Sequence, residues 1–284
     1  MVQALEKTSL KGKIVLVTGG GSGIGKATAK AFKDAGAKVL IVGRDEEKLK
    51  ATVEQINVDY QTVHVEDIAS VTVLVNKIIK VYARLDILVN CAGVYGPIGK
   101  FHENNLDLWQ EALRINLIGT VNMCHAVLPL MLKQESGKII NLSGGGAVQP
   151  FENFSAYATS KAAVVRFTEN LSKEYSSYNI QVNAVAPGAV NTKFLDQVLE
   201  AGEKNVGSEF YKKSLEQQQT GGDDPDSAAE LIVFLCNPGN TLTGKLISAK
   251  WDPWQNWDAT DIKKINSENE YTLRRIDNKY FYAR

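Results

Sequence analysis

The sequence has few cysteines and histidines, no excess of either charge and no long apolar run, and each shortage excludes a class of protein. The three cysteines lie far apart in apolar surroundings and the three histidines are scattered, so neither set has metal-ligand spacing. We expect no metal, and free buried thiols of the kind that cytoplasmic proteins carry. The 32 basic and 32 acidic residues cancel, which argues against nucleic acid or an anionic membrane as a partner.

No apolar run approaches the roughly 20 residues of a membrane-spanning helix. The first ten residues also lack the apolar core of a secretory signal. We therefore expect a cytoplasmic protein that does not contact a membrane.

Short apolar runs alternate with helix-like stretches along almost all of the 284 residues. We predict strands at 14–17, 39–42, 60–65, 86–90, 138–142, 180–185 and 245–248. We predict helices at 26–35, 46–56, 71–83, 106–132, 155–176 and 226–236, with Pro129 bending or ending the long one. Repeated βα units require right-handed crossovers and a parallel sheet covered on both faces. The predicted fold is therefore α/β, a single domain built on a doubly wound sheet of about seven strands.

No linker rich in proline, glycine or serine divides the chain, so we assign residues 1–250 to one catalytic domain. Residues 251–284 form a tail of different character, in which Trp251, Trp254 and Trp257 recur every three residues. Either these tryptophans form aromatic platforms near a substrate, or they pack on a neighbouring subunit, since tryptophan buries a large area. We favour the packing role.

The first strand runs directly into a glycine loop and then a helix, in the stretch KGKIVLVTGGGSGIG at 11–25. Glycines let the backbone adopt positive φ and let a ligand approach closely. A helix N-terminus with free N–H groups favours an anion such as a pyrophosphate. The loop reads T-G-x-x-x-G-x-G, longer than the common dinucleotide fingerprint.

Ligands of open α/β sheets bind beyond the carboxyl ends of the strands, so the residues after each strand matter. Arg44 follows the second strand and suits the 2′-phosphate of NADP, while Asp45 is expected to cap the next helix. Ser22 argues mildly against NADP because a basic residue in the glycine loop would help to bind that phosphate. Asp67 follows the third strand and suits either an adenine amine or a helix N-cap.

Tyr157 and Lys161, in the stretch YATSK, share one face of a predicted helix because they are four residues apart. An ammonium beside a phenol stabilises the phenolate and lowers its pKa. Such a tyrosine can exchange a proton with a carbonyl or an alcohol. We expect this pair at the mouth of the dinucleotide site.

Taken together, these motifs resemble the shorter, reductase-type branch of the short-chain dehydrogenase/reductase family over roughly residues 10–248. The resemblance rests on the glycine loop, Asp67, the N-x-A-G segment at 90–93, Asn116 in RINLIGT, the Tyr157/Lys161 pair and Pro187-Gly188 with Thr192. It implies a Rossmann fold, a lid at about 189–222, and a homodimer or homotetramer made through the two long helices.

The resemblance also assigns roles to residues of this chain. The implied catalytic residues are Asn116, Ser143, Tyr157 and Lys161. The implied cofactor-binding residues are Gly19, Gly21, Ser22, Gly23, Ile24, Gly25, Arg44, Asp67, Ile68, Asn90, Ala92, Gly93, Tyr157, Lys161, Pro187, Gly188, Val190 and Thr192. In the family tyrosine is the general acid/base, lysine binds the nicotinamide ribose and lowers the tyrosine pKa, and asparagine holds a water.

One position departs from the family pattern. The serine that usually lies thirteen residues before the tyrosine is Gly144 here, and Ser143 lies one residue earlier, where a strand residue would point the other way. Either the loop rotates so that Ser143 serves, or another group or the substrate supplies the donor, or the protein binds nucleotide with little catalysis.

We predict an oxidoreductase that interconverts a carbonyl and a secondary alcohol with NADP, preferred over NAD, and a small-molecule substrate. The alternatives are a nucleotide-binding protein with little catalysis, which Gly144 suggests, and a sugar-nucleotide-modifying enzyme of the longer branch. The glycine loop and the chain length both argue against the longer branch.

Overall fold

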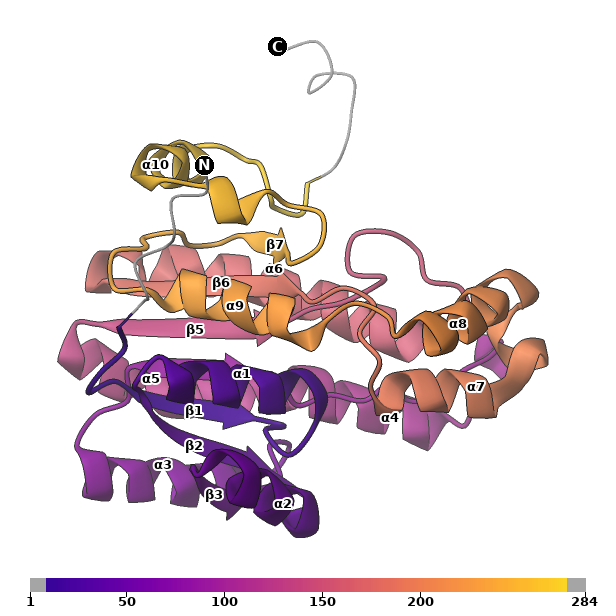
Figure 1. Ribbon diagram of the computed structural model, residues 1–284, viewed down its shortest axis with the longest axis horizontal. Coiled ribbons are helices and arrows are strands. Elements are labelled where there is room, and N and C mark those ends of the chain that lie inside the picture. Colours follow the sequence, from indigo (N-terminus) through magenta and orange to yellow (C-terminus); the bar gives the residue numbers. More distant parts are fainter. Residues whose placement is uncertain (1–8, 275–284) are drawn as a thin grey trace.

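The central feature of the computed structural model, which describes residues 9–274, is a parallel sheet of seven strands in the order β3-β2-β1-β4-β5-β6-β7 (Figure 1). The strands are β1 (Ile14–Thr18), β2 (Lys38–Gly43), β3 (Asp59–Thr62), β4 (Ile87–Asn90), β5 (Gly137–Leu142), β6 (Ile180–Ala186) and β7 (Leu246–Ser248). The helices are α1 (Gly23–Asp34), α2 (Glu46–Ile56), α3 (Ile68–Tyr82), α4 (Leu106–Leu113), α5 (Gly119–Gln134), α6 (Ser155–Glu174), α7 (Lys193–Val206), α8 (Ser208–Thr220), α9 (Pro225–Cys236) and α10 (Ala259–Ser267). The predicted doubly wound sheet is confirmed.

Two segments lie outside the described residues. They are the first eight residues, which belong to the segment expected to lack a secretory signal, and residues 275–284 of the predicted tail.

Two hydrophobic layers cover the two faces of the sheet. Val15 and Val17 of β1 belong to the layer formed with α1, α2 and α9, whereas Leu16 faces the layer formed with α3, α5 and α6. Successive strand residues point to opposite faces, so a strand buried on both faces needs an uninterrupted apolar run. That is why the runs in the sequence located the strands.

The third strand is shorter than predicted. It pairs with β2 only as far as Thr62, because β2 ends at Gly43. Val63 and Val65, which the prediction placed in the strand, instead follow it and line a cavity.

The long helix predicted at 106–132 consists of α4 and α5, joined by a π-helical turn at Arg114–Ile118. Pro129 does not end the helix, which continues to Gln134. Proline removes one backbone hydrogen bond, and the buried Leu128, Leu130 and Met131 keep this part of α5 on the sheet.

By length and composition alone, the stretch Leu106–Gln134 could also cross a membrane. Half of its most apolar window is buried inside the protein. A helix of the domain core needs the same composition, so we assign it to the core.

The segment predicted as a lid forms α7 and α8, which lie beyond the carboxyl ends of the central strands (Figure 1). Gly202 interrupts α7 with φ 77°, and Gly207 separates the two helices with φ 94°. Positive φ of this kind is accessible mainly to glycine. At its base the segment is closed by a hydrogen bond from Asp223 N–H to Ala189 O of 3.0 Å.

The tryptophans of the tail have three different environments. Trp254 is 2% exposed, packs on Phe234 of α9 and donates its ring N–H to Ala249 O at 3.2 Å. Trp257 contacts the ring of Tyr271, whereas Trp251 is 78% exposed. The tail up to α10 therefore extends the core of this same chain, an arrangement that neither sequence interpretation included.

We predict that Trp254→Ala lowers the free energy of unfolding by about 3–5 kcal/mol, because it empties a fully packed aromatic site. Trp251→Ala is the matched control and should change that free energy by no more than about 0.5 kcal/mol. Urea unfolding followed by far-UV circular dichroism measures both. Equal effects of the two variants would contradict the placement of the tail.

Candidate active site

Two adjoining cavities open at the carboxyl ends of the strands. The first, of about 230 Å³, lies over the glycine loop between the ends of β2 and β4. The second, of about 150 Å³, extends from it toward α6 and the lid. Ile24, Cys91, Gly93, Thr192 and Phe194 line both cavities, so one elongated ligand could occupy the two together.

The glycine loop forms a tight cradle at the floor of the first cavity. A Cβ on Gly25 would collide with the carbonyl of Gly19, and a Cβ on Gly19 would lie 3.0 Å from Cα of Ala92. Ser22 is the N-cap of α1, yet its side chain makes no capping hydrogen bond, and the first turn has no acidic residue. The N–H groups at this helix end are thus left for an anion. The cradle fits the pyrophosphate of a dinucleotide.

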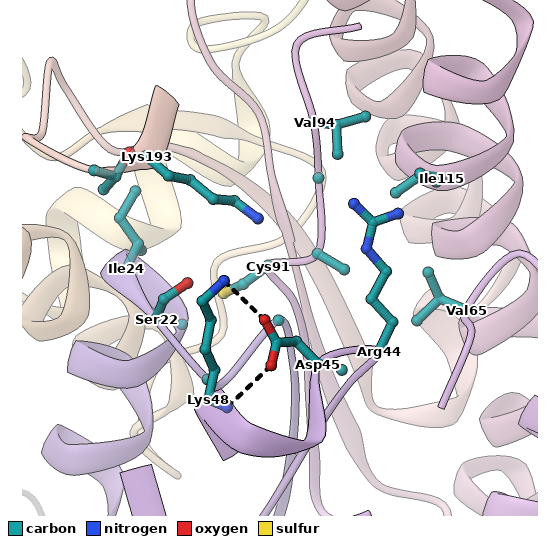
Figure 2. Close-up of a pocket in the computed structure, with 18 of the residues that line it drawn as sticks. Ser22, Ile24, Arg44, Asp45, Lys48, Val65, Cys91, Val94, Ile115 and Lys193 are labelled. Atoms are coloured by element: carbon teal, nitrogen blue, oxygen red, sulfur yellow. Dashed lines mark hydrogen bonds and ion pairs between the residues drawn. The ribbon is translucent and has the colours of Figure 1, made fainter. Parts of the chain in front are cut away.

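Three cationic side chains lie around the same cavity (Figure 2). Asp45 accepts from the Lys48 N–H at 3.1 Å and from its Nζ at 2.8 Å, so the predicted helix cap is confirmed. Arg44 extends into the cavity toward Val94 and Ile115. Lys193, which the sequence analysis missed, enters from the first residue of α7.

Three of the predicted cofactor residues do not line either cavity. Asp67 caps α3 by accepting from Ala69 and Ser70 N–H, and Ile68 begins that helix with an exposed side chain. Asn90 is buried and donates to Asn141 Oδ1 at 2.9 Å. Neither cavity is lined by these three predicted residues, whereas Gly21, Ser22, Gly23 and Ala92 all line the first.

Asn116 lies in the π-helical turn between α4 and α5 and is buried. Its side chain accepts from Val94 N–H and donates to Val94 O, each at 2.8 Å, and it donates to Ser160 Oγ at 2.9 Å. These bonds tie the loop after β4 to α6. Asn116 therefore fixes the wall against which Tyr157 lies.

Tyr157 and Lys161 do share one face of α6 and both line the second cavity. The Lys161 Nζ lies 5.6 Å from the Tyr157 ring centroid and donates to Leu142 O at 2.7 Å. Burial lowers the pKa of Lys161 to about 8, and the Cys91 thiol opposes this shift. Burial also raises the pKa of Tyr157, with a contribution from Tyr95. The expected lowering of the tyrosine pKa is thus wrong for this structure, because burial is the largest influence on this phenol.

Gly144 explains how Tyr157 packs. A Cβ at position 144 would collide with the Tyr157 hydroxyl, so that hydroxyl occupies the space that a serine at this position would need. Ser143 lines the same cavity, is 2% exposed, and its Oγ has no hydrogen-bond partner among residues 9–274. An unpartnered buried hydroxyl is costly, and here it is next to the reacting cavity.

Aromatic side chains enclose the tyrosine, and the sequence analysis missed them. The Tyr95 ring meets the Tyr157 ring edge-on at 4.7 Å and the Phe194 ring of the lid at 4.6 Å. Phe154 lies on the other side of Tyr95 at 5.2 Å. The aromatic residues lie close to the motifs in sequence, but only the fold brings the loop after β4, the start of α6 and the lid together.

Pro187, Gly188 and Val190 follow β6 and line the second cavity with Thr192. Thr192 caps α7 by accepting from Phe194 N–H at 3.3 Å. These four predicted cofactor-binding residues are thus continuous with the start of the lid.

The family model described as short chain dehydrogenase matches residues 13–203 of this sequence. This chain belongs to the short-chain dehydrogenases. The family consists of oxidoreductases on a Rossmann fold that use NAD(P).

Curated relatives are similar over most of their length. A 3-oxoacyl-[acyl-carrier-protein] reductase FabG of Thermotoga maritima is 32% identical and covers 84% of this chain and 96% of its own. A 2,3-dihydro-2,3-dihydroxybenzoate dehydrogenase of Bacillus subtilis is also 32% identical, over 80% of this chain and 89% of its own.

A solved structure of a polyketide ketoreductase with NADPH superposes with a TM-score of 0.76. It is 27% identical and covers 88% of this chain and 99% of its own. The relatives therefore share the fold and the oxidoreductase class with this short-chain dehydrogenase, while their named substrates differ.

We predict that burial of Lys161 makes stability depend on pH. The unfolded lysine keeps its ordinary pKa of 10.5 and the folded one titrates at about 8. Between these values the unfolded chain binds more protons, so this lysine makes the free energy of unfolding rise with pH; below pH 8 both states are charged and the burial cost is complete.

Lys161→Met should remove this rise, whereas Lys30→Met should not, because Asp34 shifts the pKa of Lys30 upward. Chemical unfolding at pH 7.5, 9 and 10 measures the dependence. A wild-type slope that survives in Lys161→Met would show that another group causes it.

Proposed function

We propose that this protein is an NAD(P)-dependent oxidoreductase that interconverts a carbonyl and a secondary alcohol, with Tyr157 as general acid/base. One observation carries the proposal: Tyr157, Lys161 and Ser143 line a cavity that is continuous with the cradle of the glycine loop. A proton donor thus lies beside the place where a dinucleotide would end.

The cofactor would be held by residues of the first cavity. The loop N–H groups around Ser22 would bind the pyrophosphate, and Arg44 would bind a 2′-phosphate in bidentate fashion, which favours NADP over NAD. The nicotinamide supplies hydride chemistry when bound. Lys161 and Thr192 would lie along it.

Tyr157 would exchange its proton with the substrate oxygen. Its raised pKa keeps the hydroxyl protonated in the ligand-free protein, which suits it to donate in the direction of carbonyl reduction. Below about pH 8 Lys161 is charged and stabilises the phenolate that remains. Asn116 would keep the surrounding loop in place and, as in the family, hold a water for proton exchange.

Ser143 would supply the second hydrogen bond to the substrate oxygen. Its Oγ is unpartnered and lies in the cavity wall, whereas Gly144 offers no side chain. The aromatic wall of Tyr95, Phe194 and Phe210 favours an uncharged, apolar carbonyl compound as substrate.

Assembly as a homodimer or homotetramer would fit the exposed apolar side chains of Leu106, Leu108 and Ile118 along α4 and its junction with α5.

Tyr157→Phe tests the proposal. We predict that the rate of NADPH-dependent reduction, measured at 340 nm over a panel of apolar aryl and alkyl ketones, falls by about 10²–10⁴-fold, because the proton donor is lost. NADPH affinity should stay unchanged. Tyr178→Phe, on the surface after α6, is the control. Equal rates for wild type and Tyr157→Phe would refute the assignment, and tight binding without reduction by the wild type would favour a nucleotide-binding protein.

For Ser143→Ala we predict a fall in kcat of about 10²-fold with unchanged dinucleotide affinity, since one donor to the developing oxyanion is lost. Gly144→Ser should not restore the rate lost in Ser143→Ala, because a Cβ at position 144 would displace the Tyr157 hydroxyl. Stopped-flow single turnovers measure the chemical step. Full activity of Ser143→Ala would mean that another group is the donor.

A further inference from the structure

Lys193 connects the lid to the cofactor end of the site. It is the first residue of α7 and follows Thr192. A Cβ on Gly23 would lie 2.9 Å from Thr192 Cγ2, so the start of the lid rests directly on the glycine loop. From there the Lys193 side chain extends over the first cavity (Figure 2).

Cations outnumber available carboxylates around this cavity. Its charged lining residues are Arg44, Asp45, Lys48, Glu66 and Lys193. Asp45 pairs with Lys48, and Glu66 lies 3.0 Å from the His64 ring. Within residues 9–274 neither Arg44 nor Lys193 forms an ion pair. The two are therefore free to share an anionic ligand.

The two unpaired cations and Lys48 repel one another. Burial of the Lys193 ammonium lowers its pKa, and the nearby Arg44 and Lys48 lower it further, while Asp45 only partly opposes them. An anion placed among these groups would relieve the repulsion. The position of Lys193 is thus unfavourable without a ligand and favourable with one.

Two phosphates of a dinucleotide are possible partners. The pyrophosphate would lie at the N–H groups of the glycine loop, whereas a 2′-phosphate would lie at the end of β2, next to Arg44 and Lys48. Lys193 lines the same cavity as Arg44 and Lys48, and Figure 2 shows its side chain extending from the lid toward these two residues, which also lower its pKa. This geometry favours the 2′-phosphate.

We propose that Lys193 binds the 2′-phosphate of NADP(H) together with Arg44, so that a residue of the lid distinguishes NADP from NAD. The inference rests on the proposed dinucleotide site and adds a specificity residue to it. Since Lys193 begins α7, the bound phosphate also holds the start of the lid against the glycine loop.

Lys193→Met tests this inference through measured dinucleotide affinities rather than through turnover. Isothermal titration of the full-length protein gives Kd for NADPH, NADH and 2′,5′-ADP. We expect about 10- to 100-fold weaker binding of NADPH and 2′,5′-ADP, since a charge-assisted contact is worth about 1.5–3 kcal/mol. NADH affinity should change less than about two-fold. Raising the salt concentration should reduce the difference in NADPH affinity between the wild type and Lys193→Met. Lys213→Met, a lid lysine paired with Glu209, should change none of the three.

The outcomes separate the inference from the function. An equal loss for NADPH and NADH would place Lys193 at the pyrophosphate, and no loss for either would remove it from the site; both overturn the inference alone. Wild-type protein that binds neither dinucleotide would overturn the proposed function as well. Wild-type protein that binds only NADH would overturn the inference and the NADP preference, and leave NAD-dependent catalysis standing.

Discussion

The site depends on close backbone packing between the glycine loop and the strand ends beside it. Gly25 lies directly on the carbonyl of Gly19, and Gly19 lies against the backbone of Ala92 after β4. No side chain fits between these segments, so the N–H groups of the loop remain at the surface of the cavity. Close packing here holds the loop after β4 against the glycine loop, and Asn116 bonds that loop to the helix that carries Tyr157. The glycine loop and the helix that carries Tyr157 are thereby connected through the loop after β4.

The sequence predicts the sheet well because its strands are buried on both faces. Four successive apolar residues such as Ile14 to Val17 predict a strand buried on both faces, and the glycines that follow locate the turn. A helix cap was also predicted correctly from the sequence: Asp45 was expected to cap α2, and it does. Pro129 was expected to bend or end the helix because proline removes a backbone hydrogen bond. The packing of its neighbours on the sheet instead lets the helix continue.

What the sequence could not show is how distant segments meet. Tyr95, Phe154 and Phe194 belong to three segments, and no periodicity links them, yet the rings of Tyr95 and Phe194 contact the Tyr157 ring and Phe154 packs on Tyr95. The pKa of that phenol was misjudged for the same reason. A helical spacing predicts a neighbouring ammonium, but burial depends on side chains contributed by the whole fold. Trp254 was likewise expected to pack on a neighbouring subunit, although it completes the core beside α9.

Gly144 and Ser143 mark the one position where this sequence departs from the family motif. Without a side chain at 144, the tyrosine hydroxyl packs directly on the loop backbone. The turn that follows β5 then leaves the Ser143 hydroxyl buried at the cavity wall without a partner. Burying an unpaired hydroxyl costs stability, so a substrate oxygen that accepted a hydrogen bond from it would recover that cost. Because a Cβ at position 144 would collide with the Tyr157 hydroxyl in this structure, a donor from this turn would have to come from a neighbouring position such as Ser143.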